Sequence, residues 1–269
     1  MTRRGFALLA VLWVVIALTV LAGVAIAVVH TGAETTRNRL LLARAGWARE
    51  ACVEILLARY AQDSSARGLD TVDLGRGTWC RAALDDLGAR LNVNLADLPA
   101  LRAILRVAVL DTLAADSLAQ VILTRRRLAP FSDVAELGLL PGFDSGLVAL
   151  LGAWLTTRGS GTIDVNAAPL PVLATLPGMT DEALRVLADR RGQARPLPSA
   201  DAFDALLSEP ARAALLGAFP DFVRAVTFRP VEFVGQIEGG VRGTAPRARA
   251  TITVVPAAGR LAVIRRETE

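Results

Sequence analysis

Few residues in this chain could carry out catalysis or hold a metal, and their spacing argues against both. The sequence of 269 residues has one histidine, His30, which directly follows a long apolar run. Neither a metal hydrolase nor a Ser-His-Asp triad can be built without a second histidine, a Cys/His cluster or suitably spaced carboxylates. The glycines form no phosphate-binding loop of the GxxxxGK(S/T) type. The sequence therefore predicts a protein that is not an enzyme, with His30 at a membrane surface.

The two cysteines, Cys52 and Cys80, allow two interpretations. In an oxidising compartment they could form a disulfide, which would stabilise the fold by about 2–4 kcal/mol. The alternative is that both are buried free thiols. With only two cysteines, a small fold held together by several disulfides is excluded.

The composition indicates a folded protein with a membrane segment. Hydrophobic residues make up 53% of the chain, and its 22 glycines and 13 prolines are too few for a disordered or collagen-like protein. The mean hydropathy of +0.43 is high for a soluble protein. All 30 basic residues are arginines, and they are interspersed with 26 acids. This pattern predicts a mixed solvated surface and no binding of nucleic acid.

The membrane segment is the uncharged run from Phe6 to Val29. As a helix it is roughly 36 Å long, enough to cross a hydrocarbon core of about 30 Å. Because Arg3 and Arg4 precede it, and positive residues stay on the cytoplasmic side, we expect the chain after His30 to lie outside the cytoplasm. A secretory signal peptide is the alternative, but its apolar region would span only about 7–15 residues. A retained single-pass anchor is therefore predicted.

Beyond the membrane, the same helix is expected to continue to about residue 61. Apolar residues recur there at spacings of three and four, and the polar segment 63–68 then ends the helix. Three glycines within it, Gly23, Gly32 and Gly46, are positions at which it could kink.

Strand patterns flank a long helical region. Residues 69–93 contain a turn at 75–77 and two short runs, TWCRAAL and ARLNV, that are separated by residues 85–88 and together predict a hairpin. More strand patterns lie in residues 226–269, whereas residues 94–225 look almost wholly helical. The sequence thus predicts an α+β fold, with a long N-terminal helix on a small antiparallel sheet and a large all-helical insertion between two strands of that sheet.

An internal repeat is the most specific signal in the insertion. The segment LNVNLADLPAL at 91–101 returns as IDVNAAPLPVL at 163–173, with Asn94 and Asn166 at equivalent positions. In each copy a strand end leads to an asparagine that can bond free backbone donors, and prolines that suit the first turn of a helix follow. We therefore expect two related helical subdomains.

Two Pro-Gly pairs, Pro141-Gly142 and Pro177-Gly178, mark helical hairpins in which glycine permits the sharp turn. The segment 163–191 resembles a helix-hairpin-helix motif, whose nucleic-acid-binding versions have a second glycine that lets the backbone approach a phosphate. Here Thr180 replaces that glycine, and Asp144 replaces it in the other hairpin. Because an aspartate repels phosphate, DNA binding by these hairpins is disfavoured.

The N-terminal junction and the repeats together carry a family resemblance. Met-Thr-Arg-Arg-Gly5 before Phe6 resembles the prepilin leader of type IV pilins and type II secretion pseudopilins. In that family the fifth mature residue is a glutamate, which the K-type minor component lacks; here it is Ala10. K-type members also carry two helical, SAM-like subdomains, each of which begins with a segment similar to those around Asn94 and Asn166. Over nearly its whole length, the chain resembles the type II secretion system minor pseudopilin K (general secretion pathway protein K family).

The resemblance implies cleavage by prepilin peptidase between Gly5 and Phe6, followed by N-methylation of Phe6. The domains would then be the leader (1–5), the transmembrane and periplasmic parts of the long helix (6–29 and 30–61), a pilin-like sheet (69–93 and 226–269) and a helical insertion with two SAM-like subdomains (94–225).

The resemblance also implies a location and partners. The protein would be a single-pass protein of the inner membrane, with a cytoplasmic N-terminus and a periplasmic head that caps the pseudopilus tip and supports protein export across the outer membrane. Its partners would be the I- and J-type minor pseudopilins, the pseudopilus, the inner-membrane assembly platform and prepilin peptidase. A carboxylate in hydrocarbon needs a partner charge, so a subunit with Ala10 suits the end of a fibre.

The calcium sites of the family have no recognisable counterpart in this chain. Family members usually carry a longer acidic stretch before the segment equivalent to 130–133. Calcium needs about six to eight oxygen ligands, and Asp111, Asp116, Asp133 and Glu136 are too few and too dispersed. No cofactor is therefore assigned, although the resemblance leaves calcium open.

A membrane-anchored DNA receptor of the competence type is the alternative function, because such receptors also combine an N-terminal anchor with a helix-hairpin-helix. The leader, the internal position of the hairpins and the lost hairpin glycine favour the pseudopilin.

Overall fold

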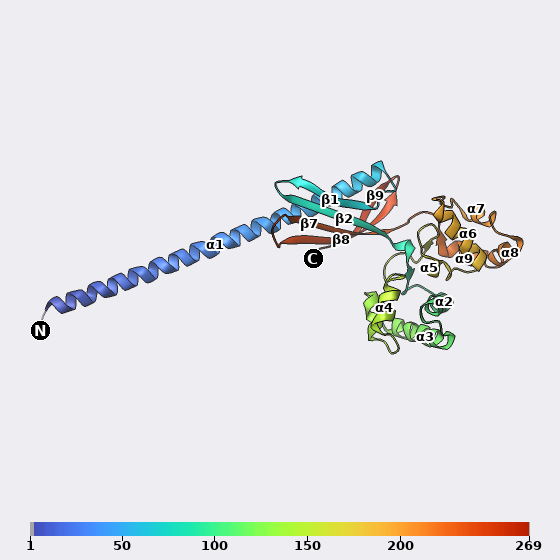
Figure 1. Cartoon of the computed structure of the whole chain (residues 1–269), viewed down its shortest axis with the longest axis horizontal. Helices are drawn as coiled ribbons and strands as arrows, with labels where there is room; N and C mark the ends of the chain where they lie inside the picture. Colours follow the sequence, from blue (N-terminus) through green and yellow to red (C-terminus); the bar gives the residue numbers. More distant parts are fainter. Residues whose placement is uncertain (1–2, 269) are drawn as a thin grey trace.

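The computed structural model describes residues 3–268, with side chains from Val11 onward. Helix α1, Arg3–Gln62, is continuous over 60 residues, which corresponds to a length of about 90 Å. The prediction of one long N-terminal helix is confirmed, and the first half of α1 projects from the head as a rod (Figure 1). Its internal glycines do not interrupt it.

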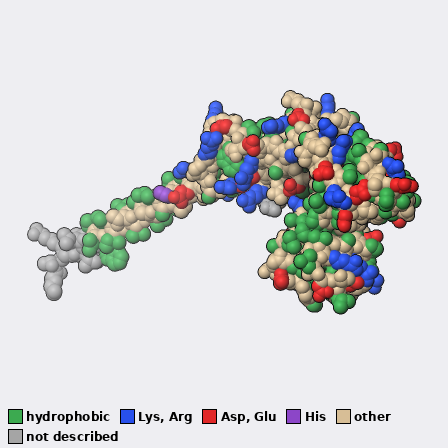
Figure 2. Space-filling view, turned by 45° about the vertical axis from the view of Figure 1, so that its right-hand side comes forward, with side chains coloured by type: hydrophobic (Ala, Val, Ile, Leu, Met, Phe, Trp, Pro, Cys, Tyr) green, Lys and Arg blue, Asp and Glu red, His purple; other side chains and the backbone are tan. Residues whose placement is uncertain are grey.

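By its length and composition, α1 can cross a membrane, and from Val11 onward none of its apolar segment is buried inside the protein. The large apolar side chains between Val11 and Val29 are 43% to 71% exposed. Figure 2 shows the rod as a mainly hydrophobic surface, with charged side chains where it approaches the head. Because exposed apolar surface of this extent is unfavourable in water, the rod needs lipid or other apolar helices around it.

A five-stranded antiparallel sheet packs on the C-terminal part of α1. Strands β2 and β7 are neighbours, with Cys80 opposite Gly239, although the chain between them holds the whole helical insertion. The prediction of a sheet built from both flanks of an insertion is confirmed. In their order across the sheet, the strands are β1 (Gly68–Gly75), β2 (Thr78–Asp86), β7 (Phe233–Val241), β8 (Arg247–Ala257) and β9 (Arg260–Thr268).

One face of the sheet is buried against α1. Cys52 and Leu56 of the helix share an apolar core with Ile237 of β7, and none of the three is more than 2% exposed. Helix and sheet approach most tightly at Gly239, where a Cβ would stand 2.5 Å from the backbone nitrogen of Arg49. The absence of a side chain at this position therefore sets the distance between the two elements.

The first hairpin differs from the prediction. The turn predicted at residues 75–77 is confirmed, but it joins the two strands of the hairpin, β1 and β2, whereas residues 85–88 were expected to separate them. Asp86 instead accepts a hydrogen bond from the Gly88 nitrogen (2.8 Å) and caps the short 3-10 helix η1 (Leu87–Ala89). This cap ends the strand and directs the chain into the insertion.

The sheet is also shorter than expected. Residues 87–93 and 226–232 lie outside it, because their strand segments pair within the insertion. Strand β3 (Leu91–Asn92) runs parallel to β4 (Leu155–Thr156), and β5 (Ile163–Asp164) runs parallel to β6 (Val226–Thr227).

The insertion forms two groups of helices beyond the sheet, at the end of the molecule opposite to the rod (Figure 1). The first group consists of α2 (Leu98–Val109), α3 (Thr112–Leu128), the 3-10 helix η2 (Val134–Leu139) and α4 (Ser145–Gly152). The second consists of α5 (Leu170–Leu173), α6 (Asp181–Gly192), α7 (Ala200–Asp204), α8 (Glu209–Gly217) and α9 (Phe219–Ala225).

The head has two separate apolar cores. One lies between α1 and the sheet and is extended by the edge-to-face contact of Tyr60 with Phe233, at 5.9 Å between ring centroids. The other runs through both helical groups and includes the stacked pair Phe203 and Phe222. The short polar junction between these cores therefore determines how the insertion sits on the sheet.

Candidate functional site

Both copies of the internal repeat enter the insertion through the same backbone arrangement. In each copy, a two-residue strand lies parallel to a second strand from the end of its subdomain. The Val93 nitrogen donates to the Thr156 carbonyl, and the Val165 nitrogen donates to the Thr227 carbonyl, both at 2.9 Å. The sequence repeat is therefore also a structural repeat.

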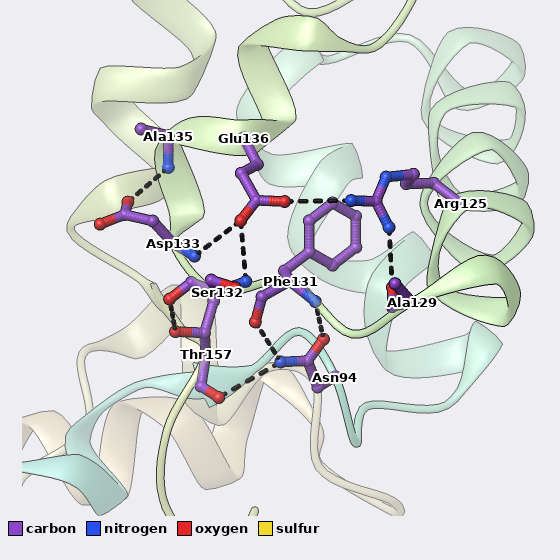
Figure 3. A network of polar contacts seen from close by, with 9 residues as sticks. All are labelled: Asn94, Arg125, Ala129, Phe131, Ser132, Asp133, Ala135, Glu136 and Thr157. Atoms are coloured by element: carbon purple, nitrogen blue, oxygen red, sulfur yellow. Dashed lines mark hydrogen bonds and ion pairs between the residues drawn. The ribbon is translucent and has the colours of Figure 1, made fainter.

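Asn94 closes the first subdomain (Figure 3). Its Oδ1 accepts a hydrogen bond from the Phe131 nitrogen (2.8 Å), and its Nδ2 donates to the carbonyls of Phe131 (2.9 Å) and Thr157 (3.2 Å). One amide thus joins the entry strand to the loop after α3 and the segment after β4. The start of α2 is capped separately, by Asp97.

Asn166 makes the equivalent contacts in the second subdomain. Its Oδ1 accepts from the Leu197 nitrogen (2.8 Å), and its Nδ2 donates to the carbonyls of Leu197 and Phe228, both at 2.9 Å. Leu197 is buried, so its backbone groups have little access to water and need these partners.

The loop that Asn94 binds is held by an ion pair and a capping box (Figure 3). Glu136 accepts hydrogen bonds from the nitrogens of Ser132 (2.9 Å) and Asp133 (3.2 Å), and its other oxygen lies 3.1 Å from Nη2 of Arg125. The Arg125 guanidinium also lies over the ring of Phe131, 5.2 Å from its centroid. These contacts give the network a structural role.

The four acids that the sequence analysis judged too few and too dispersed for calcium also have structural roles. Asp111 caps α3, and Asp133 caps η2. Asp116 lies 3.3 Å from Nε of Arg102, and Glu136 pairs with Arg125. Among the side chains that the structure describes, no three His, Cys, Asp or Glu residues gather into a metal site. These acids do not fit a calcium ion, which needs a converging set of oxygens.

The Pro-Gly turns of both hairpins are used for packing. Gly142 (φ +85°) and Gly178 (φ +72°), which follow Pro141 and Pro177, have backbone conformations that favour glycine. A Cβ on Gly178 would stand 2.9 Å from the Ala214 carbonyl oxygen in α8. On Gly142 it would stand 2.8 Å from a methyl group of a leucine in α3. Both glycines therefore allow close contact with a neighbouring helix.

The residues that replace the second hairpin glycine cap helices. Asp144 accepts a hydrogen bond from the Leu147 nitrogen (2.7 Å) at the start of α4, and Thr180 accepts one from the Ala183 nitrogen (3.2 Å) at the start of α6. These side chains occupy backbone donors that a bound phosphate would need.

Cys52 on α1 and Cys80 on β2 are both free and buried, and their thiols are within hydrogen-bonding reach across the helix–sheet interface. Burial raises the pKa of both thiols, and the neighbouring thiol adds to the rise for Cys52. The two cysteines are thus brought together as the disulfide interpretation requires, while the bond itself stays a prediction.

The processing residues lie at the limit of the described structure. Gly5, Phe6 and Ala10 fall within the backbone of α1, but their side chains are outside the described residues. Cleavage between Gly5 and Phe6, methylation of Phe6 and the significance of Ala10 therefore stay predictions.

A pair of carboxyl groups that the sequence analysis missed lies where the insertion joins the sheet. Asp86, at the end of β2, and Asp164, in β5, are within hydrogen-bonding reach of each other. Burial, together with the nearby charge of Asp164, raises the pKa of Asp86 to about 6. Burial also raises the pKa of Asp164. The repeat contains a signal for this pair: Asp164 occupies the position of Asn92 in the first copy, so an acid stands where the other copy has a neutral amide.

A cluster of arginines around a buried glutamate was also missed. Glu238 of β7 is 6% exposed and accepts hydrogen bonds from Arg81 of β2 (2.7 Å) and from Arg247 (3.1 Å) and Arg249 (3.4 Å) of β8. Burial acts to raise the pKa of Glu238, but the bonds from Arg247 and Arg81 outweigh it and lower that pKa below its usual value. The cluster joins β2, β7 and β8, and the sequence does not show that these three strands are adjacent in the sheet.

Comparison with known proteins supports the fold. No family model and no curated protein matches the chain. Among solved structures, it is similar to a chain of the GspK–GspI–GspJ complex from the type 2 secretion system of enterotoxigenic Escherichia coli, with a TM-score of 0.60 and 15% identity. The likeness covers 87% of this chain and 99% of that chain. Because the insertion is about half of this chain, the match must include most of it. The chain therefore has the fold of a subunit of that complex, with a long helix, an antiparallel sheet and inserted helices.

Proposed function

We propose that this chain is a K-type minor pseudopilin, which caps the tip of a type II secretion pseudopilus and supports its assembly without enzymatic activity. The likeness to a chain of the GspK–GspI–GspJ complex carries the proposal, because it extends beyond the long helix into the inserted subdomains. A helix on a sheet would suit any pilin-like subunit. The insertion between β2 and β7 is the more specific feature.

The exposed apolar part of α1 supports a single-pass position in the inner membrane, with the N-terminus in the cytoplasm and the head in the periplasm. Arg3 and Arg4 before the apolar run favour this orientation. The same apolar side chains would pack among the helices of a fibre once the leader has been removed.

The position at the tip is inferred from Ala10 and from the placement of the insertion. A subunit without a carboxylate at this position can offer its amine to a neighbour but cannot neutralise the amine of another subunit. The helical groups lie at the end of the head that points away from the rod (Figure 1). A cap would present them at the end of the fibre.

The proposed partners are the I- and J-type minor pseudopilins, the pseudopilus, the inner-membrane assembly platform and prepilin peptidase. The first two are supported by the composition of the complex that contains the similar chain. Purification of the full-length chain with its I- and J-type partners from the same cell is expected to yield a stable three-component complex. Absence of any association would contradict a role at the tip.

Mass spectrometry of the mature N-terminus tests the proposal most directly. With a prepilin peptidase present, we expect the chain to begin at a methylated Phe6, and without it at the original N-terminus. A Gly5→Leu variant should keep its leader. A Gly32→Leu variant should be processed normally, because a Cβ at that position would meet nothing within 4 Å beyond the backbone of its own helix. Cleavage after the apolar run would instead indicate a signal peptide.

The resemblance of the hairpins to a helix-hairpin-helix favours the second candidate function, a competence-type DNA receptor. Two observations argue against a DNA receptor: Gly142 and Gly178 are packed against neighbouring helices, and Asp144 places a carboxylate in one hairpin. Titration of the full-length chain in detergent with duplex DNA at several salt concentrations distinguishes the two functions. A pseudopilin should bind weakly, whereas tight binding that falls steeply with salt would support the receptor.

A further inference from the structure

We propose that Asp86 and Asp164 bind one proton between them, and that this proton holds the second helical subdomain to the sheet. When the proton is lost, the junction between η1 and β5 loosens. The inference does not depend on the proposed function, because it concerns only groups within the head.

Each of the two carboxyl groups is fixed by a local hydrogen bond. Oδ1 of Asp86 accepts from the Gly88 nitrogen, and Oδ1 of Asp164 accepts from the Asn166 nitrogen, both at 2.8 Å. Asp164 is 1% exposed, and Oδ2 of Asp86 is buried without a hydrogen-bond partner among the described residues if both groups are counted as ionised. A proton on one carboxyl supplies the missing donor.

The two groups cannot separate without opening the junction. A Cβ on Gly88 would stand 3.1 Å from the Asp164 nitrogen and 3.2 Å from the Asp164 Cβ. The backbone that carries Asp86 therefore lies in direct contact with the backbone that carries Asp164. Repulsion between two buried carboxylates would act on the chain segments themselves.

Two arginines face the pair, but within residues 11–268 neither forms an ion pair with it. Arg67 donates to the carbonyls of Ser64 (2.8 Å) and Ala66 (3.2 Å). Arg191 donates to the Val165 carbonyl (2.5 Å). Both arginines lower the pKa of Asp164 from a distance, yet burial outweighs them.

Arg158 is paired with Glu267 of β9 (2.9 Å), and Glu232, a further charged residue at the junction, adds no neutralising charge. The Glu232 carbonyl accepts from the Leu87 nitrogen (3.1 Å), and its carboxylate lies beside Gly159. The negative charge of an ionised Asp86–Asp164 pair is thus left without a direct partner, which favours the form that shares a proton.

The first copy of the repeat shows the same position with a neutral side chain. Asn92 donates its Nδ2 to the carbonyls of Arg158 (3.0 Å) and Gly159 (2.9 Å). An ionised Asp164 has no hydrogen to donate at the equivalent place. A proton bound by the pair gives the second copy a hydrogen-bond donor at this position, although its acceptor is the carboxyl of Asp86 and not a backbone carbonyl.

The direction of the pH dependence follows from the raised pKa of Asp86. The folded chain binds the proton more tightly than the unfolded chain, whose aspartate has its ordinary value of 3.8. The contribution of the pair to stability is therefore greatest at low pH and falls as the pH rises to about 6. We expect the junction to be closed in mild acid and looser at neutral pH.

Hydrogen exchange on the full-length chain in detergent tests the inference with an internal control. We expect protection of the amides in 163–168 to fall by about tenfold or more between about pH 5 and about pH 7.5. The equivalent amides in 91–96, beside Asn92, should keep their protection. Equal responses of the two segments, or no response in either, would overturn the proposal.

An Asp164→Asn variant adds a second readout. Its amide can donate to the orphaned Asp86 oxygen, so protection of 163–168 should become independent of pH. Asp85→Asn is the matched control, because Asp85 is exposed on the same strand and should leave the pH response unchanged. A response that persists in Asp164→Asn would overturn the proposal. If this variant does not fold, the comparison of the two segments in the unchanged chain still decides.

Discussion

Asn94 and Asn166 each satisfy backbone groups that lie 31 to 63 residues away along the chain. A side-chain amide is suited to this task because it combines an acceptor with two donors in one plane.

We expect Asn166→Ala to lower the free energy of unfolding by about 2–4 kcal/mol, because it leaves buried backbone groups of Leu197 without partners. Asn94→Ala should have a similar effect in the first subdomain. Urea unfolding of the full-length chain in detergent measures both. Asn38→Ala, on an exposed part of α1, is the control and should change stability little. Equal effects of all three variants would contradict the proposed role of the amides.

The thiols of Cys52 and Cys80 should be protected in the native protein. Burial raises the pKa of both, and only the thiolate reacts with alkylating agents. At neutral pH we expect slow labelling of the folded chain by iodoacetamide and rapid labelling of both cysteines after unfolding. Mild oxidation should produce a disulfide within the chain, detectable by mass spectrometry after digestion. Rapid labelling of the native chain would show that the helix–sheet interface is open.

At the scale of the elements, the contact between α1 and the sheet depends on a glycine as well as on the apolar side chains of their shared core. Strand β7 can approach the helix this closely only because Gly239 has no Cβ: one there would stand 2.5 Å from the backbone nitrogen of Arg49 and 2.7 Å from the backbone oxygen of Ala45. Backbone atoms cannot move aside as the end of a flexible side chain can, so a larger residue must push the helix from the sheet.

Gly239→Ala is therefore expected to lower the free energy of unfolding by about 1–3 kcal/mol or more, through overpacking. Gly46 lies on α1 with open space around it, so Gly46→Ala should have the opposite effect and stabilise α1 by up to about 1 kcal/mol. Chemical unfolding of both variants checks this difference in sign. A stable Gly239→Ala protein would mean that helix and sheet can slide apart at little cost.

At the scale of the whole molecule, the rod and the head are energetically separate. Among residues 11–268, neither apolar core includes a residue before Ala48, and the helix is exposed from Val11 to Leu40. The apolar part of α1 thus contributes to membrane or fibre contacts and not to the folding of the head.

A fragment that begins at residue 31 should consequently fold and remain in solution without detergent. We expect the same hydrogen-exchange protection in its sheet and helical insertion as in the full-length chain. Loss of protection in β7 or β8 would show that the first half of α1 contributes to the stability of the head.

The long apolar helix, the inserted helical region and its two repeated entries were predictable from the sequence alone. Each is a local pattern: an uncharged run, a helical spacing of apolar residues, or a segment that recurs along the chain. Local patterns also separated strands from helices well enough to indicate an α+β fold. The turn at residues 85–88 was predicted wrongly. Asp86 caps a short 3-10 helix, and the residues around it do not distinguish this role from a turn between two strands.

The pairing of distant groups was decided only by the tertiary structure. The loops that Asn94 and Asn166 bind, the carboxyl pair of Asp86 and Asp164, and the arginines around Glu238 are brought together by the docking of elements far apart in the chain. The free energy of such contacts depends on burial and on the neighbouring charges, and neither is a property of a residue's sequence neighbours.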